Sequence, residues 1–174
     1  MNFEIKVLEE LKKETRRRLF KENLTRLQKC LSILNDEELW HRSNKNTVSA
    51  GNLVLHLTGN IRQWLLSGIG GEPDKRVRQS EFDEVGPLPA AELLDNLKSV
   101  LHDVDMLLDR LTPEDLIKKI EVQGFDESGL SIIVHVVEHF SCHVGQITYI
   151  TKAKKNIDLK YCGDIDLDQT SPSQ

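Results

Sequence analysis

Apolar residues recur every three to four positions along most of the chain, the spacing that places them on one face of an α-helix. This pattern covers four segments and predicts helices over residues 3–34, 47–69, 90–111 and 128–154. The third segment is the most regular, because Leu94, Leu97, Leu101, Val104 and Leu108 alternate in steps of three and four. Such a stripe is typical of a helix that packs at a shallow angle against its neighbours. The sequence therefore predicts an all-α protein, a four-helix bundle with long inter-helix loops.

Short segments between these helices carry local signals of their own. Asn35 followed by Glu38 predicts a capping box that starts a short helical turn. Thr112 and Pro113 predict the N-cap and the first residue of another turn. The segment KIEVQGF, residues 119–125, alternates between apolar and polar residues and is predicted to be a short extended stretch.

The connection over residues 72–89, EPDKRVRQSEFDEVGPLP, is charged and longer than a turn between bundle helices needs, so it could cover a site. Arg76 and Arg78 in this loop are interpreted as solvated charges, with the attraction of an acidic cosubstrate as the alternative. The glycines just before the loop close a helix and do not open one. We therefore interpret them as a helix end and not as a phosphate-binding loop.

The length of 174 residues fits one domain, and 39% hydrophobic with 29% charged residues describe a globular protein. We expect a metal-binding four-helix bundle over residues 1–155 and a polar C-terminal tail over residues 156–174. Cys30, Cys142 and Cys162 are too few and too scattered for a disulfide framework or a C-x-x-C site, so they are expected to be free thiols.

The net charge of −5 and the pI of about 5.7 argue against nucleic acid as a partner, because binding to phosphates needs a basic face. A basic run over residues 12–21 is interleaved with glutamates and is expected to be a solvated helix face. No apolar stretch approaches the ~20 residues of a membrane span, and the first residues do not resemble a signal peptide. We expect no membrane association and a cytoplasmic location.

The most informative motif is EHFSCHVGQI, residues 138–147, which places His139 and His143 four residues apart. At about 100° per residue, both histidines lie within about 20° of the line that joins Ile132 and Ile150, on the buried face. A buried imidazole without a hydrogen-bond partner costs ~1–3 kcal/mol, so two in a passive core are unfavourable. Histidines spaced i, i+4 can instead bind one metal ion together.

A third ligand is expected from another helix. His56 lies between Leu53 and Leu57 in the segment NLVLHLTGN, on the face that meets the interior of the bundle. His56, His139 and His143 would then bind a divalent ion and leave a position open for water or substrate, as in catalytic sites. The alternative is that these histidines are ordinary core residues.

Four other polar residues are candidates for substrate binding or for the support of the ligands. Asn60 and Gln63 follow His56 at one and two helical turns, and Gln146 lies three residues after His143. His135 precedes His139 by one turn but lies about 12 Å along the axis from His143, so one ion cannot bind all three of these histidines. It is expected to be a supporting or interfacial group, with metal ligation as the alternative. Ordinary bundle polarity is the alternative for Asn60, Gln63 and Gln146.

The segments GNLVLHLTGNIRQW and EHFSCHVGQI together resemble the motifs of the DinB-like (YfiT-like) family of candidate metalloenzymes. This resemblance implies an up-down-down-up four-helix bundle, a homodimer, and a metal ion bound by His56, His139 and His143. It implies zinc or nickel as the metal, with manganese or iron as alternatives. Members of the family include transferases that activate a low-molecular-weight thiol at the metal, a thiol-dependent isomerase and proposed hydrolases.

Three functional hypotheses follow. In the first, a metal-bound low-molecular-weight thiol is transferred to a small electrophile. In the second, the same position activates water for hydrolysis. In the third, the ion only ties two helices together in a non-enzymatic structural or interaction bundle. The motif contains no obvious carboxylate base, because Glu138 points away from the site, and this favours the thiol hypothesis.

Overall fold

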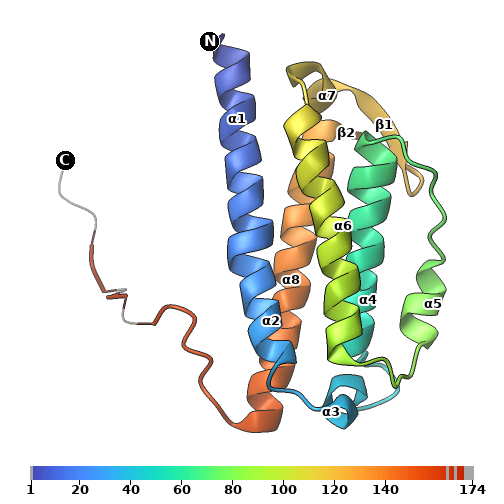
Figure 1. Ribbon diagram of the computed structural model, residues 1–174, viewed down its shortest axis with the longest axis vertical. Helices are drawn as coiled ribbons and strands as arrows, with labels where there is room; N and C mark the ends of the chain where they lie inside the picture. The colour runs from blue at the N-terminus through green and yellow to red at the C-terminus, as the bar shows by residue number, and fades with distance from the viewer. Residues whose placement is uncertain (1, 164, 167, 171–174) are drawn as a thin grey trace.

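The computed structural model describes residues 2–163, 165–166 and 168–170, and it consists of four long helical segments side by side (Figure 1). The predicted all-α four-helix bundle is confirmed. The first segment is α1 (Phe3–Arg16), which continues through the π-helical η1 (Arg17–Leu24) into α2 (Thr25–Leu31). The second is α4 (Ala50–Ile61), which continues into the π-helical η2 (Arg62–Ile69). The third is α6 (Ala90–Arg110) and the fourth is α8 (Gly129–Lys155).

The directions of the four segments explain the long loop between the second and the third. The first and last segments run one way along the bundle, while α4 and α6 both run the other way (Figure 1). The chain must therefore return along the whole length of the bundle between α4 and α6. This return contains a short helix that was not predicted, α5 (Arg78–Asp83), which packs against α4.

Capping residues set the starts of several helices. Asn35 with Glu38 begins α3 (Asp36–Trp40), and Thr112 with Asp115 begins α7 (Pro113–Ile117), so both predicted turns are confirmed. The second long helix was expected from residue 47 but begins at Ala50. The physical reason is that the Ser49 side chain caps the backbone N–H of Asn52.

The predicted extended stretch is one half of an antiparallel hairpin, in which β1 (Lys119–Val122) pairs with β2 (Phe125–Ser128). The second strand was missed, because the four residues of β2 lack a clear apolar alternation. Gln123 and Gly124 form the two-residue turn with φ values of 53° and 82°. Positive φ at both positions gives the twist that a tight hairpin requires.

The apolar stripes of the four long helices meet in one core. Each contributes fully buried side chains, including Leu27, Leu57, Leu101 and Phe140. The helix pairs α4 with α6, α4 with α8 and α2 with α8 are in contact. Among the described residues, no helix combines the length and apolar character that a transmembrane span requires.

Part of the segment after residue 155 packs against the bundle. Leu159 is buried in the core, and the hydroxyl oxygen of Tyr161 lies 3.1 Å from Cys30 Sγ and 2.9 Å from Thr148 Oγ1. All three cysteines are free thiols, as predicted. The division of the chain at residue 155 stays a prediction, and these contacts show that the segment beyond it adds to the core.

Candidate metal centre

His56 on α4 meets His139 and His143 on α8 in the interior between the two helices. One ligand nitrogen from each ring lies within 4.8 Å of the other two. The Nε2 atoms of His56 and His139 are 2.9 Å apart, and the ring centroids of His139 and His143 are 4.4 Å apart. The three predicted ligands are therefore brought together by the packing of α4 on α8.

The dimensions of this group suit a metal ion. Ligand bonds of 2.0–2.1 Å in a tetrahedral site correspond to nitrogen atoms about 3.4 Å apart. The observed separation of 2.9 Å between His56 Nε2 and His139 Nε2 needs only a small opening of the rings to reach this value. Histidine nitrogens are ligands for zinc, nickel and other divalent ions, so these residues can bind a metal ion.

Hydrogen bonds at the far side of two rings fix which nitrogen faces the centre. His56 Nδ1 lies 2.8 Å from Glu81 Oε2, and His143 Nδ1 lies 2.7 Å from Gln146 Oε1. Arg76 Nη2 also lies 3.1 Å from His56 Nδ1, but the contact of Nδ1 with Glu81 is the shorter one. Because a carboxylate and an amide oxygen can only accept, the hydrogen bonds to Glu81 and Gln146 place the proton on each Nδ1. Each Nε2 then carries a lone pair, as a metal ligand requires, and that of His56 faces His139 Nε2 at 2.9 Å.

Glu81 is itself held by a buried arginine. Arg76 Nε donates to Glu81 Oε1 at 2.7 Å and Nη2 donates to Oε2 at 2.8 Å, while the two side chains are only 6% and 9% exposed. Arg76 Nη1 also donates to Gln63 Oε1 at 2.8 Å, and Gln63 Nε2 donates to Asp74 Oδ2 at 2.7 Å. The interpretation of Arg76 as a solvated charge is wrong, because α5 brings Glu81 to it.

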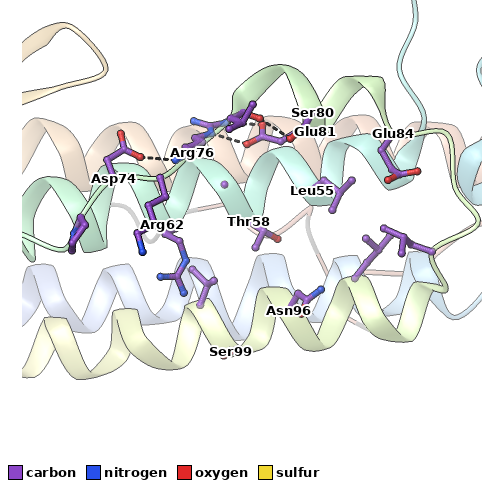
Figure 2. A pocket seen from close by; sticks show the side chains of 17 residues that line it. Leu55, Thr58, Arg62, Asp74, Arg76, Ser80, Glu81, Glu84, Asn96 and Ser99 are labelled. Carbon is purple, nitrogen blue, oxygen red and sulfur yellow. Dashed lines mark hydrogen bonds and ion pairs between the residues drawn. The ribbon is translucent and has the colours of Figure 1, made fainter.

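The close approach of this ion pair to α4 depends on a glycine. A Cβ atom at Gly59 would lie 2.0 Å from Glu81 Oε1 and 3.0 Å from Arg76 Nε. The Arg76–Glu81 pair forms part of the wall of a cavity of about 610 Å³ between α4, α6 and the loop that contains α5 (Figure 2). Asp74 accepts from the backbone N–H of Arg76 at the edge of this cavity.

The electrostatics keep the group in the protonation states that suit a metal. Burial, followed by the neighbouring histidines His143 and His56, lowers the pKa of His139 to about 3. Burial also lowers the pKa of His143. Burial alone would raise the pKa of Glu81, but hydrogen bonds from Arg76 and His56 outweigh it and lower that pKa. At neutral pH, His139 and His143 are therefore neutral and Glu81 is charged.

The four supporting residues take different places. Gln146 orients His143, and Gln63 contacts Arg76 and not the ligands. The His135 ring stacks on Trp64 with centroids 3.8 Å apart, and its Nε2 lies 3.5 Å from Asn60 Nδ2. The close group of ligand nitrogens consists of His56, His139 and His143, and His135 lies outside it.

Sequence reasoning missed Glu81, the closest carboxylate partner of a central histidine. Its helix, α5, has six residues, too short for a periodic apolar stripe. The available signal was the unusual length of the loop over residues 72–89, which indicated that the loop could cover a site. The loop and α5 supply both Arg76 and Glu81 to the surroundings of His56.

A second cavity, of about 310 Å³, adjoins His56 and His139 and is lined in part by the β1–β2 hairpin. Trp64 Nε1 donates to Gln123 Oε1 at 2.9 Å, which ties the hairpin turn to η2 beside this cavity. We call it the histidine cavity. Its lining residues are His56, Asn60, Trp64, Arg76, Arg78, Gln123, Phe125, Glu127, His135 and His139.

Comparison with known proteins supports the fold and the family. A crystal structure of a DinB-like protein from Bacillus cereus ATCC 10987 matches with a TM-score of 0.62 and 21% sequence identity, covering 78% of this chain and 87% of that chain. The bundle therefore has a DinB-like fold, as the resemblance of the sequence implied. No curated protein matches the chain. Residues 8–163 match the family described as Protein of unknown function (DUF1572), and the chain belongs to this family.

Proposed function

We propose that His56, His139 and His143 bind one divalent metal ion and that the protein is a metal-dependent enzyme. The observation that carries this proposal is the convergence of three histidine nitrogens within 4.8 Å of one another beside a cavity. Among the described residues, no fourth histidine, cysteine or carboxylate joins this group. An open coordination position beside a cavity favours a catalytic ion over one that only ties helices together. Zinc and nickel are the metals we expect.

The reaction we propose is transfer of a low-molecular-weight thiol to a small electrophile. A bound divalent ion with an open position lowers the pKa of a thiol and supplies a thiolate at neutral pH. The chain supports this choice because Glu81 is already engaged by Arg76 and His56, so it is not free to act as a base toward water. The volume of about 310 Å³ suits small reactants.

Metal-dependent hydrolysis is the second candidate, and one residue favours it. Glu127 lines the histidine cavity, and its Oε2 accepts a hydrogen bond from Ser131 Oγ at 2.6 Å. A carboxylate in this place could take a proton from water. Thiol transfer and hydrolysis would then differ in their need for Glu127.

The first experiment is the metal content of the purified protein. Mass spectrometry of untagged wild type is expected to find about one zinc or nickel ion per chain, and little metal in His56→Ala, because two ligands do not form a tight site. His102→Ala is the matched control, since His102 is exposed on α6. Equal metal content in all three proteins, or none after incubation with both metals, contradicts the site.

The second experiment tests the reaction class. Low-molecular-weight thiols added to the cobalt-substituted protein are expected to produce sulfur-to-cobalt absorption bands if a thiol binds the ion. An unchanged spectrum together with hydrolytic turnover that is lost in Glu127→Gln would favour hydrolysis. An unchanged spectrum without any turnover would contradict both reactions.

A further inference from the structure

The histidine cavity contains polar groups that the three-histidine site does not use. Its walls come from four parts of the chain: α4 with η2, the loop that leads into α5 together with the first residue of α5, the hairpin, and α8. Asn60, Arg78 and Glu127 lie in three of these walls and differ in charge. Which of these side chains lack a hydrogen-bond or ion-pair partner indicates the chemistry of the ligand.

Asn60 has a buried acceptor without a partner. The residue is 3% exposed, and its Oδ1 atom makes no hydrogen bond among the described residues. Its Nδ2 group lies 3.5 Å from His135 Nε2, so Oδ1 is the polar atom of the amide that has no partner. An unsatisfied buried acceptor is costly, and such groups are rare in native proteins. A ligand with an N–H or O–H donor would remove this cost.

Arg78 supplies a positive charge that no acid balances. Its guanidinium lies over the Phe82 ring, 4.8 Å from the centroid, and no carboxylate of the described residues forms an ion pair with it. Arg76, the other cation in the cavity wall, is neutralised by Glu81. Arg78 is therefore the cation available to an anionic group of a ligand.

Glu127 supplies the opposite charge from the hairpin. Its contact is the hydrogen bond from Ser131 Oγ, and it forms no ion pair with Arg78 or with another described cation. The cavity thus offers one unpaired cation, one unpaired anion and one unsatisfied acceptor. In the same cavity, Trp64 and Phe125, with ring centroids 6.2 Å apart, provide apolar surface for a short carbon skeleton.

We propose that the histidine cavity binds a small zwitterion of the amino-acid type. Its ammonium group donates to Asn60 Oδ1 and pairs with Glu127, and its carboxylate pairs with Arg78. This assignment rests on the proposed function, because it places the amino-acid part of a substrate beside the three histidines. It deepens that function by naming the charges that the substrate carries.

The test uses ligands that cannot bind a metal through a thiolate, so it depends on the cavity and not on the reaction. Isothermal titration calorimetry of the full-length protein as purified compares S-methyl-L-cysteine, its carboxamide, which lacks the carboxylate, and 3-(methylthio)propionate, which lacks the ammonium group. S-methyl-L-cysteine is expected to bind at least about 10-fold more tightly than either analogue. The carboxamide loses the ion pair with Arg78, and 3-(methylthio)propionate loses the ion pair with Glu127.

Two variants assign the charges to residues. Arg78→Gln is expected to reduce the affinity for S-methyl-L-cysteine to that for the carboxamide, and Glu127→Gln to reduce it to that for 3-(methylthio)propionate. Lys75→Gln is the matched control, because Lys75 is an exposed cation of the same loop that lines the other cavity. Arg78 is exposed and Glu127 is half-buried, so neither change disturbs the core.

The outcomes separate this inference from the proposed function. Equal affinities for the three ligands, no binding of S-methyl-L-cysteine, or losses in Lys75→Gln as large as in Arg78→Gln would overturn the zwitterion assignment. The cobalt spectrum and the metal content test the metal and the thiol independently. A charge preference in a protein that binds no metal would support the ligand assignment while the proposed function fails.

Discussion

Glu81 Oε2 lies 2.8 Å from Nδ1 of His56, so a short helix outside the four-helix core fixes the orientation of a central histidine. The two side chains are 25 residues apart in the sequence. Glu81 receives two further hydrogen bonds from Arg76, which keep its carboxylate charged and in place. Carboxylates that hydrogen-bond to metal-binding histidines fix the tautomer and raise the affinity for the metal.

Replacement of Glu81 by glutamine is expected to weaken metal binding by about 10–100-fold, because the acceptor of the His56 proton loses its charge and Arg76 loses its partner. Competition with a chromogenic chelator measures the change. Asp83→Asn, an exposed change in the same helix, is the control and should bind metal like the wild type. Equal affinities in the two variants would refute a role for Glu81 in positioning His56.

A methyl group at residue 59 is expected to displace the Glu81 carboxylate. Alanine favours a helix over glycine by about 1 kcal/mol, so propensity alone predicts that Gly59→Ala stabilises α4. The new Cβ atom would lie only 2.0 Å from Glu81 Oε1, so the carboxylate must move away from His56. We therefore expect Gly59→Ala to lower the affinity for the metal.

Gly68→Ala is the control for this steric effect, because its nearest contact would be an ordinary 3.6 Å. The same chelator competition, with thermal unfolding beside it, compares the two variants. Loss of affinity in both, or in neither, would contradict the steric argument.

The stability of the metal-free protein is expected to fall as the pH falls below 6.5. The pKa of His139 is about 3 in the folded state and near 6.5 when unfolded, so below pH 6.5 the unfolded state takes up a proton first. The stability that the neutral His139 side chain contributes is therefore fully present above pH 6.5 and is lost as the pH falls toward about 3.

Urea unfolding in the presence of a chelator, between pH 7 and about 5, measures this dependence. His139→Gln should make the free energy of unfolding less dependent on pH, and His102→Gln, at an exposed position, should leave the dependence unchanged. An identical pH dependence in the wild type and His139→Gln would show that His139 does not carry it.

Removal of the segment after Lys155 is expected to lower the free energy of unfolding by at least ~1.5 kcal/mol, because it exposes the surface that Leu159 buries. The hydrogen bonds of Tyr161 to Cys30 and Thr148 are lost as well. A chain shortened after Gly163 keeps these contacts and is the control. Equal stability of the two shortened chains would support a domain boundary at residue 155.

Much of the candidate site could be predicted because its motif is local. His139 and His143 lie one turn apart on one helix, so their shared face follows from the helical period. His56 required one further step, the assumption that its apolar face meets the same core, and the packing of α4 on α8 confirms it. The roles of Gln63 and Arg76 could not be predicted, because their partners come from a loop without periodic structure.

The sequence by itself determined the four long helices, the capped starts of the short helices α3 and α7, and the inward faces of the three histidines. These features depend on the spacing of residues within one segment and on side chains that bond to nearby backbone. The tertiary structure alone decided that Glu81 orients His56, that Arg76 is buried, and that Asn60 and Arg78 share a cavity with the hairpin. The physical reason is that these contacts join irregular segments far apart in the chain, and no periodicity encodes where a loop returns to a helix.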